Sequence, residues 1–362
     1  MIATRIYNFS SGPAVLPTPV LEEAQRDLLA LTGVGMSVLE ISHRSQPFEE
    51  IFHRAEADLR QVGGVPDHYA VLFLQGGPSL QFSMVPMNLL GPDATADYVL
   101  TGSWAEKAAK EAKRVGKVHI AATTAADLFS RIPRQDELAL TPRAAYVHIT
   151  SNNTIEGTEW RTLPDVGDVP LVSDASSDIF SRPIDVNRHG VIYAGAQKNI
   201  GPAGLTVVII RKDLLERSSS DLHTMLNYKI HTDNGSLYNT PPVFAIYILG
   251  LVMKWIIAQG GLSAMARVNG RKAATLYAEI DRSGFYRGTA RADSRSLMNV
   301  TFRLQSEDLE KRFVKESTAA GLDGLKGHRS VGGMRASVYN AFPEEGVDVL
   351  VQFMREFERR NG

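Results

Sequence analysis

Apolar and polar positions along the chain predict a buried sheet covered by helices. Between residues 69 and 211, short runs that are apolar on both faces alternate with stretches of helical spacing. Such runs are typical of parallel strands with both faces covered. We interpret the following segments as strands: 69–74, 97–102, 144–150, 169–174, 190–195 and 205–211. The pattern predicts an α/β fold with a mostly parallel sheet at roughly residues 65–215.

Helical spacing accounts for most of the remaining chain. Pro17 or Thr18 can start a helix whose apolar face reaches Leu31 and which Gly33 would end. Further helices are predicted after Pro47 and over 78–90, 104–115 and 241–284. The most apolar stretch, 243–258, is too short to span a bilayer and contains a lysine, so we expect a buried helix.

The pattern changes towards the C-terminus. A strand over 296–304, a helix over 306–321, a strand over 332–340 and a helix from Pro343 to Arg360 are expected there. With 362 residues the chain is long for a single core. We therefore predict a large domain over 16–260 and a smaller α+β domain over 261–362, which the segment 1–15 would join.

Composition narrows the classes of function. The formal net charge is −1, so the chain has no basic field for nucleic acid or an anionic membrane. It contains no cysteine, which excludes disulfides, thiolate metal sites and cysteine nucleophiles. The first residues lack the apolar core and cleavage site of a signal peptide. We expect a cytoplasmic protein.

A lysine and an aspartate indicate the chemistry. Lys198 lies in GAQKNIGPAG, a nearly charge-free turn of small residues between two predicted strands, and Asp174 ends the strand VPLVSD. Lysine forms a Schiff base with pyridoxal phosphate, and an aspartate commonly pairs with the pyridinium nitrogen of that cofactor. The pair predicts a pyridoxal-phosphate enzyme.

Other residues that could contact a ligand also follow predicted strands. They are Gly77, Pro78, Ser79, Trp104, Thr154 and Gln197. Ligands of open α/β sheets bind beyond the carboxyl ends of the strands, so one ligand could touch all of them. A Gly-Gly turn that opens a helix suits a phosphate. A nucleotide site is the alternative interpretation of this turn, but the chain has neither GxxxxGK[ST] nor GxGxxG there.

Cationic residues form a second group. His43-Arg44 and His328-Arg329 are two His-Arg pairs, and Arg335 starts a predicted strand. The fork of an arginine matches carboxylates and phosphates. We expect a substrate with a phosphate at one end and a carboxylate at the other. No grouping of histidine and acidic residues has metal-ligand spacing, so no metal is expected.

Several long motifs carry a resemblance to a known family. They are NFSSGPAVLP, SVLEISHRS, ITSNNTIEGTE, AGAQKNIGPAGLTVVI, DNGSLYNTPP and GLKGHRSVGGMRASVYNA. With these motifs the chain resembles the phosphoserine aminotransferases, a family of class V within the fold-type-I pyridoxal-phosphate transaminases. The resemblance implies a seven-stranded sheet, a homodimer and amino transfer from glutamate to 3-phosphohydroxypyruvate in serine biosynthesis. A related step in pyridoxine biosynthesis, which yields 4-phosphohydroxythreonine, is a further expectation.

The resemblance also implies a role for each site residue. Lys198 would bind the cofactor covalently and Asp174 would hold its pyridine nitrogen protonated. Trp104 would stack on the ring, Thr154 would bind its phenolic oxygen, and the phosphate would contact Ser79, Gln197 and, from the neighbouring subunit, Asn239 and Thr240. The substrate would be bound by Ser11, His43, Arg44, His328, Arg329 and Arg335.

One position departs from the family. Many relatives have Gly-Arg where this chain has Pro78-Ser79, and proline has no N–H to donate to a phosphate. We predict that Gly77 and Ser79 replace that contact. Three alternatives to the family reaction fit the sequence less well. Cysteine desulfuration needs a cysteine, an alanine–glyoxylate exchange needs less positive charge than two His-Arg pairs, and a non-catalytic binder needs no Asp174.

Overall fold

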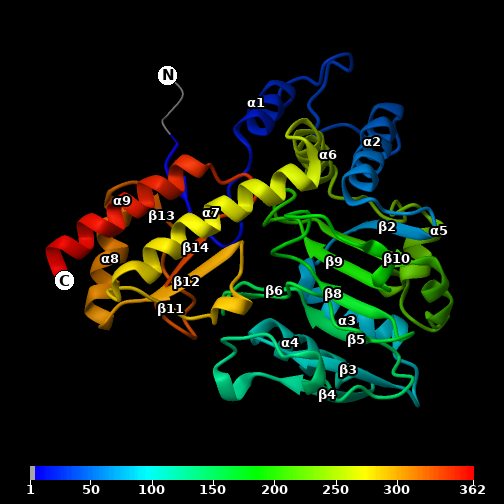
Figure 1. The fold of residues 1–362 in the computed structure, drawn as a ribbon. Helices are drawn as coiled ribbons and strands as arrows, with labels where there is room; N and C mark the ends of the chain where they lie inside the picture. Colours follow the sequence, from blue (N-terminus) through cyan, green and yellow to red (C-terminus); the bar gives the residue numbers. More distant parts are fainter. Residues whose placement is uncertain (1–4) are drawn as a thin grey trace.

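A seven-stranded sheet in the order β2-β10-β9-β8-β5-β3-β4 forms the centre of the computed structural model, which describes residues 5–362 (Figure 1). Its strands are β2 (Tyr69–Leu74), β3 (Thr95–Leu100), β4 (Lys117–Thr123), β5 (Val147–Thr150), β8 (Leu171–Asp174), β9 (Val191–Gly195) and β10 (Thr206–Arg211). Strand β10 is antiparallel to β2 and β9, and the other pairs are parallel. The predicted mostly parallel sheet is confirmed.

The apolar pattern identified every strand of this sheet except β4. That strand lies at the edge of the sheet, and most of its residues are partly or fully exposed. Strand β2 lies at the opposite edge and is fully buried, so the exposure of β4 rather than its edge position removes the need for a continuous apolar run, and periodicity gave no signal for it.

Helices cover both faces of the sheet (Figure 1). Val71 and Phe73 of β2 pack in one core with α2 (Gln46–Gly63) and α6 (Val243–Ala258), while Leu72 and Leu74 pack on the other face with α3 (Gly77–Leu89) and α4 (Ser103–Ala112). This alternation explains why the strands are apolar on both faces. The expectation that 243–258 is a buried helix is confirmed.

Helix α1 (Thr18–Asp27) is shorter than predicted, since it ends before Leu31 and Gly33. Only Val20 and Ala24 of this helix are buried, and Leu29 beyond it is 88% exposed. An apolar residue adds no helical stability when it has nothing to pack against. The helix therefore stops before the exposed Leu28 and Leu29, and Leu31 packs against the core from outside the helix.

A three-stranded antiparallel sheet, β11-β12-β14, lies beside the large sheet. The elements of this region are α7 (Gly261–Ser283), β11 (Arg287–Gly288), β12 (Asn299–Arg303), α8 (Glu307–Ala319), β13 (Leu322–Asp323), β14 (Met334–Ser337) and α9 (Glu344–Asn361). The order predicted for the C-terminal region is confirmed.

The N-terminal segment joins this smaller region. Strand β1 (Tyr7–Asn8) pairs in parallel with β13, and Phe9 lies in the apolar core of the C-terminal region. Helices α6 and α7 meet at an angle of 83° close to residue 260. These contacts support the predicted division at 260/261, which we keep as a proposal. Residues 1–4 of the predicted joining segment lie outside the described residues.

Two hairpins carry residues that face the same cavity, among them Lys198 and Thr154. Strands β9 and β10 are joined by the turn 196–205, which contains Lys198 and is closed by a hydrogen bond from Ala196 N to Leu205 O (3.0 Å). Strands β6 (Asn152–Asn153) and β7 (Thr158–Glu159) form a second hairpin, called here the 152–159 hairpin. A short helix, α5 (Tyr228–Asp233), packs near β2.

In the part of the chain that the structure describes, no single helix has both the length and the apolar character needed to cross a membrane. Only α6 and α7 taken together, across their bend, meet those two criteria.

Candidate active site

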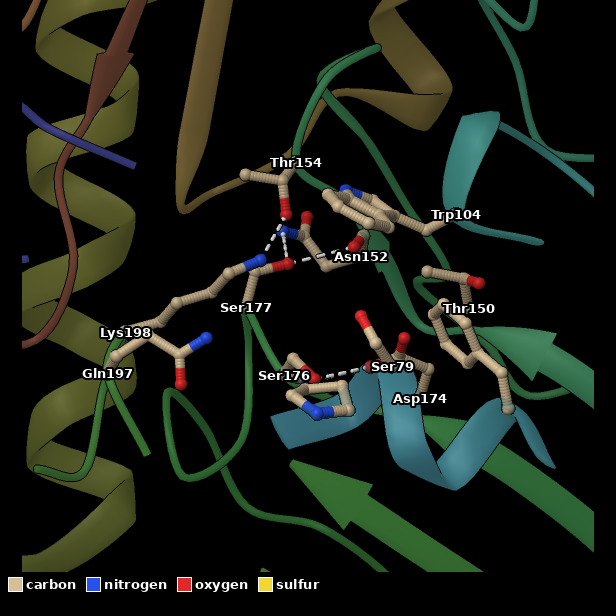
Figure 2. Close-up of a pocket in the computed structure, with 12 residues that line it drawn as sticks. Ser79, Trp104, Thr150, Asn152, Thr154, Asp174, Ser176, Ser177, Gln197 and Lys198 are labelled. Atoms are coloured by element: carbon tan, nitrogen blue, oxygen red, sulfur yellow. Dashed lines mark hydrogen bonds between the residues drawn. The ribbon is translucent and has the colours of Figure 1, made fainter. Parts of the chain in front are cut away.

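A cavity opens at the carboxyl ends of strands β5, β8 and β9 (Figure 2). Predicted site residues that line it are Pro78, Ser79, Trp104, Thr154, Asp174, Gln197 and Lys198. They come from separate segments of the chain, and the strand topology brings their ends to one edge of the sheet. The structure brings these side chains to one cavity, and their binding of one ligand stays a prediction.

Lys198 presents its amine to this cavity. Its Nζ donates a hydrogen bond to Thr154 Oγ1 at 2.7 Å (Figure 2). Burial lowers the pKa of Lys198 to about 8, although the charge of Asp174 acts in the opposite direction. The lysine therefore carries more free amine at neutral pH than a surface lysine does, which is the form that attacks an aldehyde.

Asp174 is buried at the end of β8, with 4% of its surface exposed. Its Oδ1 accepts hydrogen bonds from the N–H (3.0 Å) and the hydroxyl (2.5 Å) of Ser176. Burial raises the pKa of this carboxyl, while Ser176 and Lys198 favour its charged form. A carboxylate fixed in this way suits a cationic heterocycle nitrogen.

Helix α3 begins at the cavity. Gly76 precedes it in the left-handed conformation (φ 85°), and Pro78 occupies its first turn, where a missing N–H costs the helix nothing. Ser79 reaches the cavity with its side chain. The free N–H groups of the first turn and the helix dipole attract an anion. Gly77 does not line the cavity, so the predicted replacement contact falls first to Ser79.

Gly195 leaves room between this helix and Gln197. A Cβ at position 195 would lie 2.5 Å from Gln197 Oε1 and 2.8 Å from Pro78 Cδ. A larger side chain here would push into Gln197 and Pro78, two residues that line the cavity.

Trp104 forms one wall of the cavity from the first turn of α4 (Figure 2). Lys107 Nζ lies 4.0 Å from the centroid of its ring, a cation–π distance. The indole Nε1 and the hydroxyl of Thr150, which also lines the cavity, are buried and have no partner within residues 5–362. Buried polar atoms are rarely left unpaired in native proteins, so both fit a bound polar group.

Arg335 lies next to the cavity on β14. Its guanidinium donates to Ser11 Oγ (2.7 Å) and to the carbonyl oxygen of Thr154 (3.4 Å), and its Nε has no partner in the described chain. The side chain is 8% exposed, and burial lowers its pKa. An arginine with a free donor beside the reactive amine is suited to bind a carboxylate.

Other predicted residues lie away from this cavity. His328 and Arg329 line a neighbouring depression over the loop 326–333, and His328 bonds Ser330 Oγ (2.7 Å). His43 and Arg44 lie in the turn before α2, and Arg44 is exposed. Asn239 and Thr240 lie beside Gln75, whose Nε2 donates to Thr240 O (3.1 Å), rather than in the cavity of their own subunit.

The cavity also contains residues that sequence reasoning missed: Phe82, Thr150, Asn152, Ser176 and Ser177. Thr150 is the last residue of β5, and the two serines lie two and three residues after Asp174, the last residue of β8. The same rule about strand ends that selected Asp174 could have found these three. Phe82 sits in the apolar core of α3 and has no polar signal in the sequence.

The residues of the cavity fit pyridoxal phosphate. The amine of Lys198, the buried carboxylate of Asp174, the ring of Trp104 and the start of α3 offer partners for an aldehyde, a pyridine nitrogen, an aromatic face and a phosphate. The hydroxyl of Thr150, which has no hydrogen-bond partner among residues 5–362, adds a polar partner.

Comparisons with known proteins identify the family. The family model "Aminotransferase class-V" matches residues 6–350. A phosphoserine aminotransferase of Desulfosudis oleivorans is 58% identical over 363 residues and covers 100% of both chains. The solved phosphoserine aminotransferase of Bacillus circulans subsp. alkalophilus is 53% identical, with 99% of each chain covered and a TM-score of 0.97.

A third relative contains the cofactor. The pyridoxal-phosphate-bound phosphoserine aminotransferase of Trichomonas vaginalis is 41% identical, covers 97% of this chain and 100% of its own, and has a TM-score of 0.93. With a family model and relatives that match almost the whole length, the chain belongs to the class-V aminotransferases and, within them, to the phosphoserine aminotransferase family.

Proposed function

We propose that this protein is a pyridoxal-phosphate-dependent transaminase that moves the amino group between L-glutamate and 3-phosphohydroxypyruvate, giving O-phospho-L-serine and 2-oxoglutarate. The observation that carries this proposal is the amine of Lys198, whose pKa is lowered to about 8 beside the buried carboxylate of Asp174. The substrates follow from the full-length relatives. The product places the reaction in serine biosynthesis.

Each residue of the site has a role in this reaction. When bound, pyridoxal phosphate supplies an aldehyde carbon and an electron-accepting ring. Lys198 Nζ would hold the cofactor and, once released by substrate, would carry the proton between the substrate Cα and the aldehyde carbon of the cofactor, in opposite directions in the two half-reactions. The Thr154 hydroxyl holds that nitrogen at 2.7 Å. Asp174 keeps a proton on the ring nitrogen.

Substrate binding is assigned to the cationic residues. Arg335, with Ser11, binds the α-carboxylate, since its Nε is free and lies beside the cavity. His43, Arg44, His328 and Arg329 bind the phosphate of the ketoacid and the side-chain carboxylate of glutamate in turn. The four-carbon phosphorylated ketoacid that leads to 4-phosphohydroxythreonine has the same end groups, and we propose it as a second acceptor.

The site is proposed to be completed in a homodimer. Asn239 and Thr240 are assigned to the cofactor phosphate of the partner subunit, which accounts for their absence from the cavity of their own. Sedimentation across a dilution series tests this, because a fully active monomer would contradict it. A cytoplasmic location is part of the proposal, to be checked by cell fractionation.

A substrate panel with glutamate as donor tests the function. Activity is expected with 3-phosphohydroxypyruvate and the four-carbon phosphorylated ketoacid, and little with pyruvate or glyoxylate. Preference for glyoxylate would favour an alanine–glyoxylate exchange.

Lys198→Ala is expected to abolish turnover and the visible absorbance of the bound cofactor; an unchanged spectrum would contradict the covalent role. Borohydride treatment of the wild-type protein is expected to tag Lys198, and no tag would contradict it.

A further inference from the structure

Glu156 lies in the 152–159 hairpin, two residues after Thr154, and has no assigned role in the reaction. Its side chain is 7% exposed. Oε1 accepts hydrogen bonds from the backbone N–H and the hydroxyl of Ser103, both at 2.8 Å. Ser103 is the first residue of α4, so a carboxylate distant in sequence accepts one of the free backbone N–H groups of the first turn of this helix.

The neighbouring glycine shows how closely this carboxylate approaches the helix. A Cβ at Gly102 would lie 2.5 Å from Glu156 Oε2, so only glycine leaves the space. Gly102 is the N-cap residue of α4, and as a glycine it has no side chain that could cap the helix. Trp104 directly follows Ser103, and the Glu156 bonds therefore fix the turn that presents the indole ring to the cavity.

The main chain of Glu156 faces the smaller sheet. Its carbonyl oxygen accepts a hydrogen bond from Thr301 Oγ1 at 3.1 Å. Thr301 on β12 is the register partner of Arg335 on β14. Contact at this point is tight, since a Cβ at Gly157 would lie 2.2 Å from Thr301 Oγ1.

Glu156 thus contacts the segments that hold Trp104 and Arg335, two separate residues of the site. Its side chain holds the turn of Trp104, and its carbonyl holds the strand beside Arg335. We propose that Glu156 is a positioning residue that couples the Arg335 carboxylate clamp to the Trp104 ring. The inference rests on the proposed function, in which those two residues contact substrate and cofactor.

The coupling has a direct consequence for binding. A substrate that orders Arg335 also orders β12, and the bond from Thr301 passes this constraint to the hairpin and to the first turn of α4. Cofactor stacking and substrate binding should therefore respond together to changes at Glu156. A change at Thr301 should act mainly on the substrate, because it leaves the bonds to Ser103 intact.

Three variants of the holoenzyme test the coupling. Glu156→Ala is expected to weaken binding of pyridoxal phosphate to the cofactor-free protein about fivefold and to raise the KM for glutamate by a similar factor, since a lost helix-capping contact has effects of this size. Glu156→Gln keeps the acceptor and should restore both values to near wild type. Thr301→Val should raise the KM and change cofactor affinity less than twofold.

Controls separate positioning from stability. Glu159→Ala removes another buried carboxylate of the same hairpin, one that accepts a hydrogen bond from Leu297 N (2.7 Å) and has none to α4 within the described residues. This variant should lower thermal stability without changing the induced circular dichroism of the cofactor band. If Glu156→Ala does not fold, Ser103→Ala removes one of the two bonds and should shift the dichroism and the cofactor affinity in the same direction. Unchanged cofactor affinity and unchanged KM in the folded variants, with a normal chromophore on Lys198, would overturn the coupling and leave the proposed function intact.

Discussion

The lowered pKa of Lys198 leads to a quantitative prediction about the cofactor-free protein. At pH 7 a lysine with a pKa of about 8 is about 9% free amine, whereas one at the ordinary 10.5 is about 0.03% free amine, a difference of about 300-fold. Because the charge of Asp174 raises this pKa, Asp174→Asn should lower it further and increase the free amine. The same substitution should nevertheless reduce transamination by orders of magnitude, since it removes the partner of the ring nitrogen.

Trace acetylation at a series of pH values, with quantification of each lysine peptide by mass spectrometry, measures this pKa. Labelling of Lys198 should rise with a midpoint near pH 8 and shift to lower pH in Asp174→Asn. Lys272 provides an internal control. Burial lowers its pKa to about 7, but its amine is enclosed by the carbonyl oxygens of Tyr339 (2.6 Å) and Phe342 (3.1 Å), so it should stay unlabelled. A wild-type midpoint above pH 10, or an upward shift in Asp174→Asn, would refute the reasoning.

Three further predictions concern other parts of the molecule. Gly195→Ala should weaken cofactor binding about tenfold, because overpacking of this order forces Gln197 or Pro78 to move; spectroscopic titration of the cofactor-free protein measures it, and unchanged affinity would contradict the close packing. Arg44→Ala should raise the KM for the phosphorylated ketoacid at least about tenfold and leave cofactor affinity unchanged, and an equal effect on pyruvate would speak against a phosphate role. Burial raises the pKa of Asp178 to about 7 from 3.8, so the buried acid stabilises the fold fully below pH 4 and loses this contribution as the pH rises to 7. Urea unfolding should therefore show the free energy of unfolding of the wild type, relative to Asp178→Asn, falling between pH 4 and 7; a difference independent of pH would contradict this.

Burial on both faces explains how much of the fold could be predicted. Strands such as β2 and β10 lie between two layers of helices, so their sequences are runs of mostly apolar residues, and that pattern is visible in one sequence. The edge strand β4 and the end of α1 have one side without a partner. Their limits depend on tertiary contacts that periodicity does not encode.

The site divides in a similar way. Asp174, Thr154 and Lys198 follow strands, so the topology of a parallel sheet gathers them without knowledge of any distance. Ser176 and Ser177 lack the charge that would draw attention to them. The part assigned to Glu156 could not be foreseen, because it depends on which backbone N–H groups the side chain meets after the hairpin folds back on α4.

The turn 196–205 has a mechanical consequence. Since it connects two adjacent antiparallel strands that both have neighbours on each side, both of its ends are anchored in the hydrogen-bonded sheet. The travel of the amine during a catalytic cycle must therefore come from rotations about the four methylene groups of the lysine rather than from loop displacement. Lengthening the turn would loosen this anchor point, and replacing the lysine by a shorter amine would shorten the reach by a fixed amount that the backbone is unable to restore.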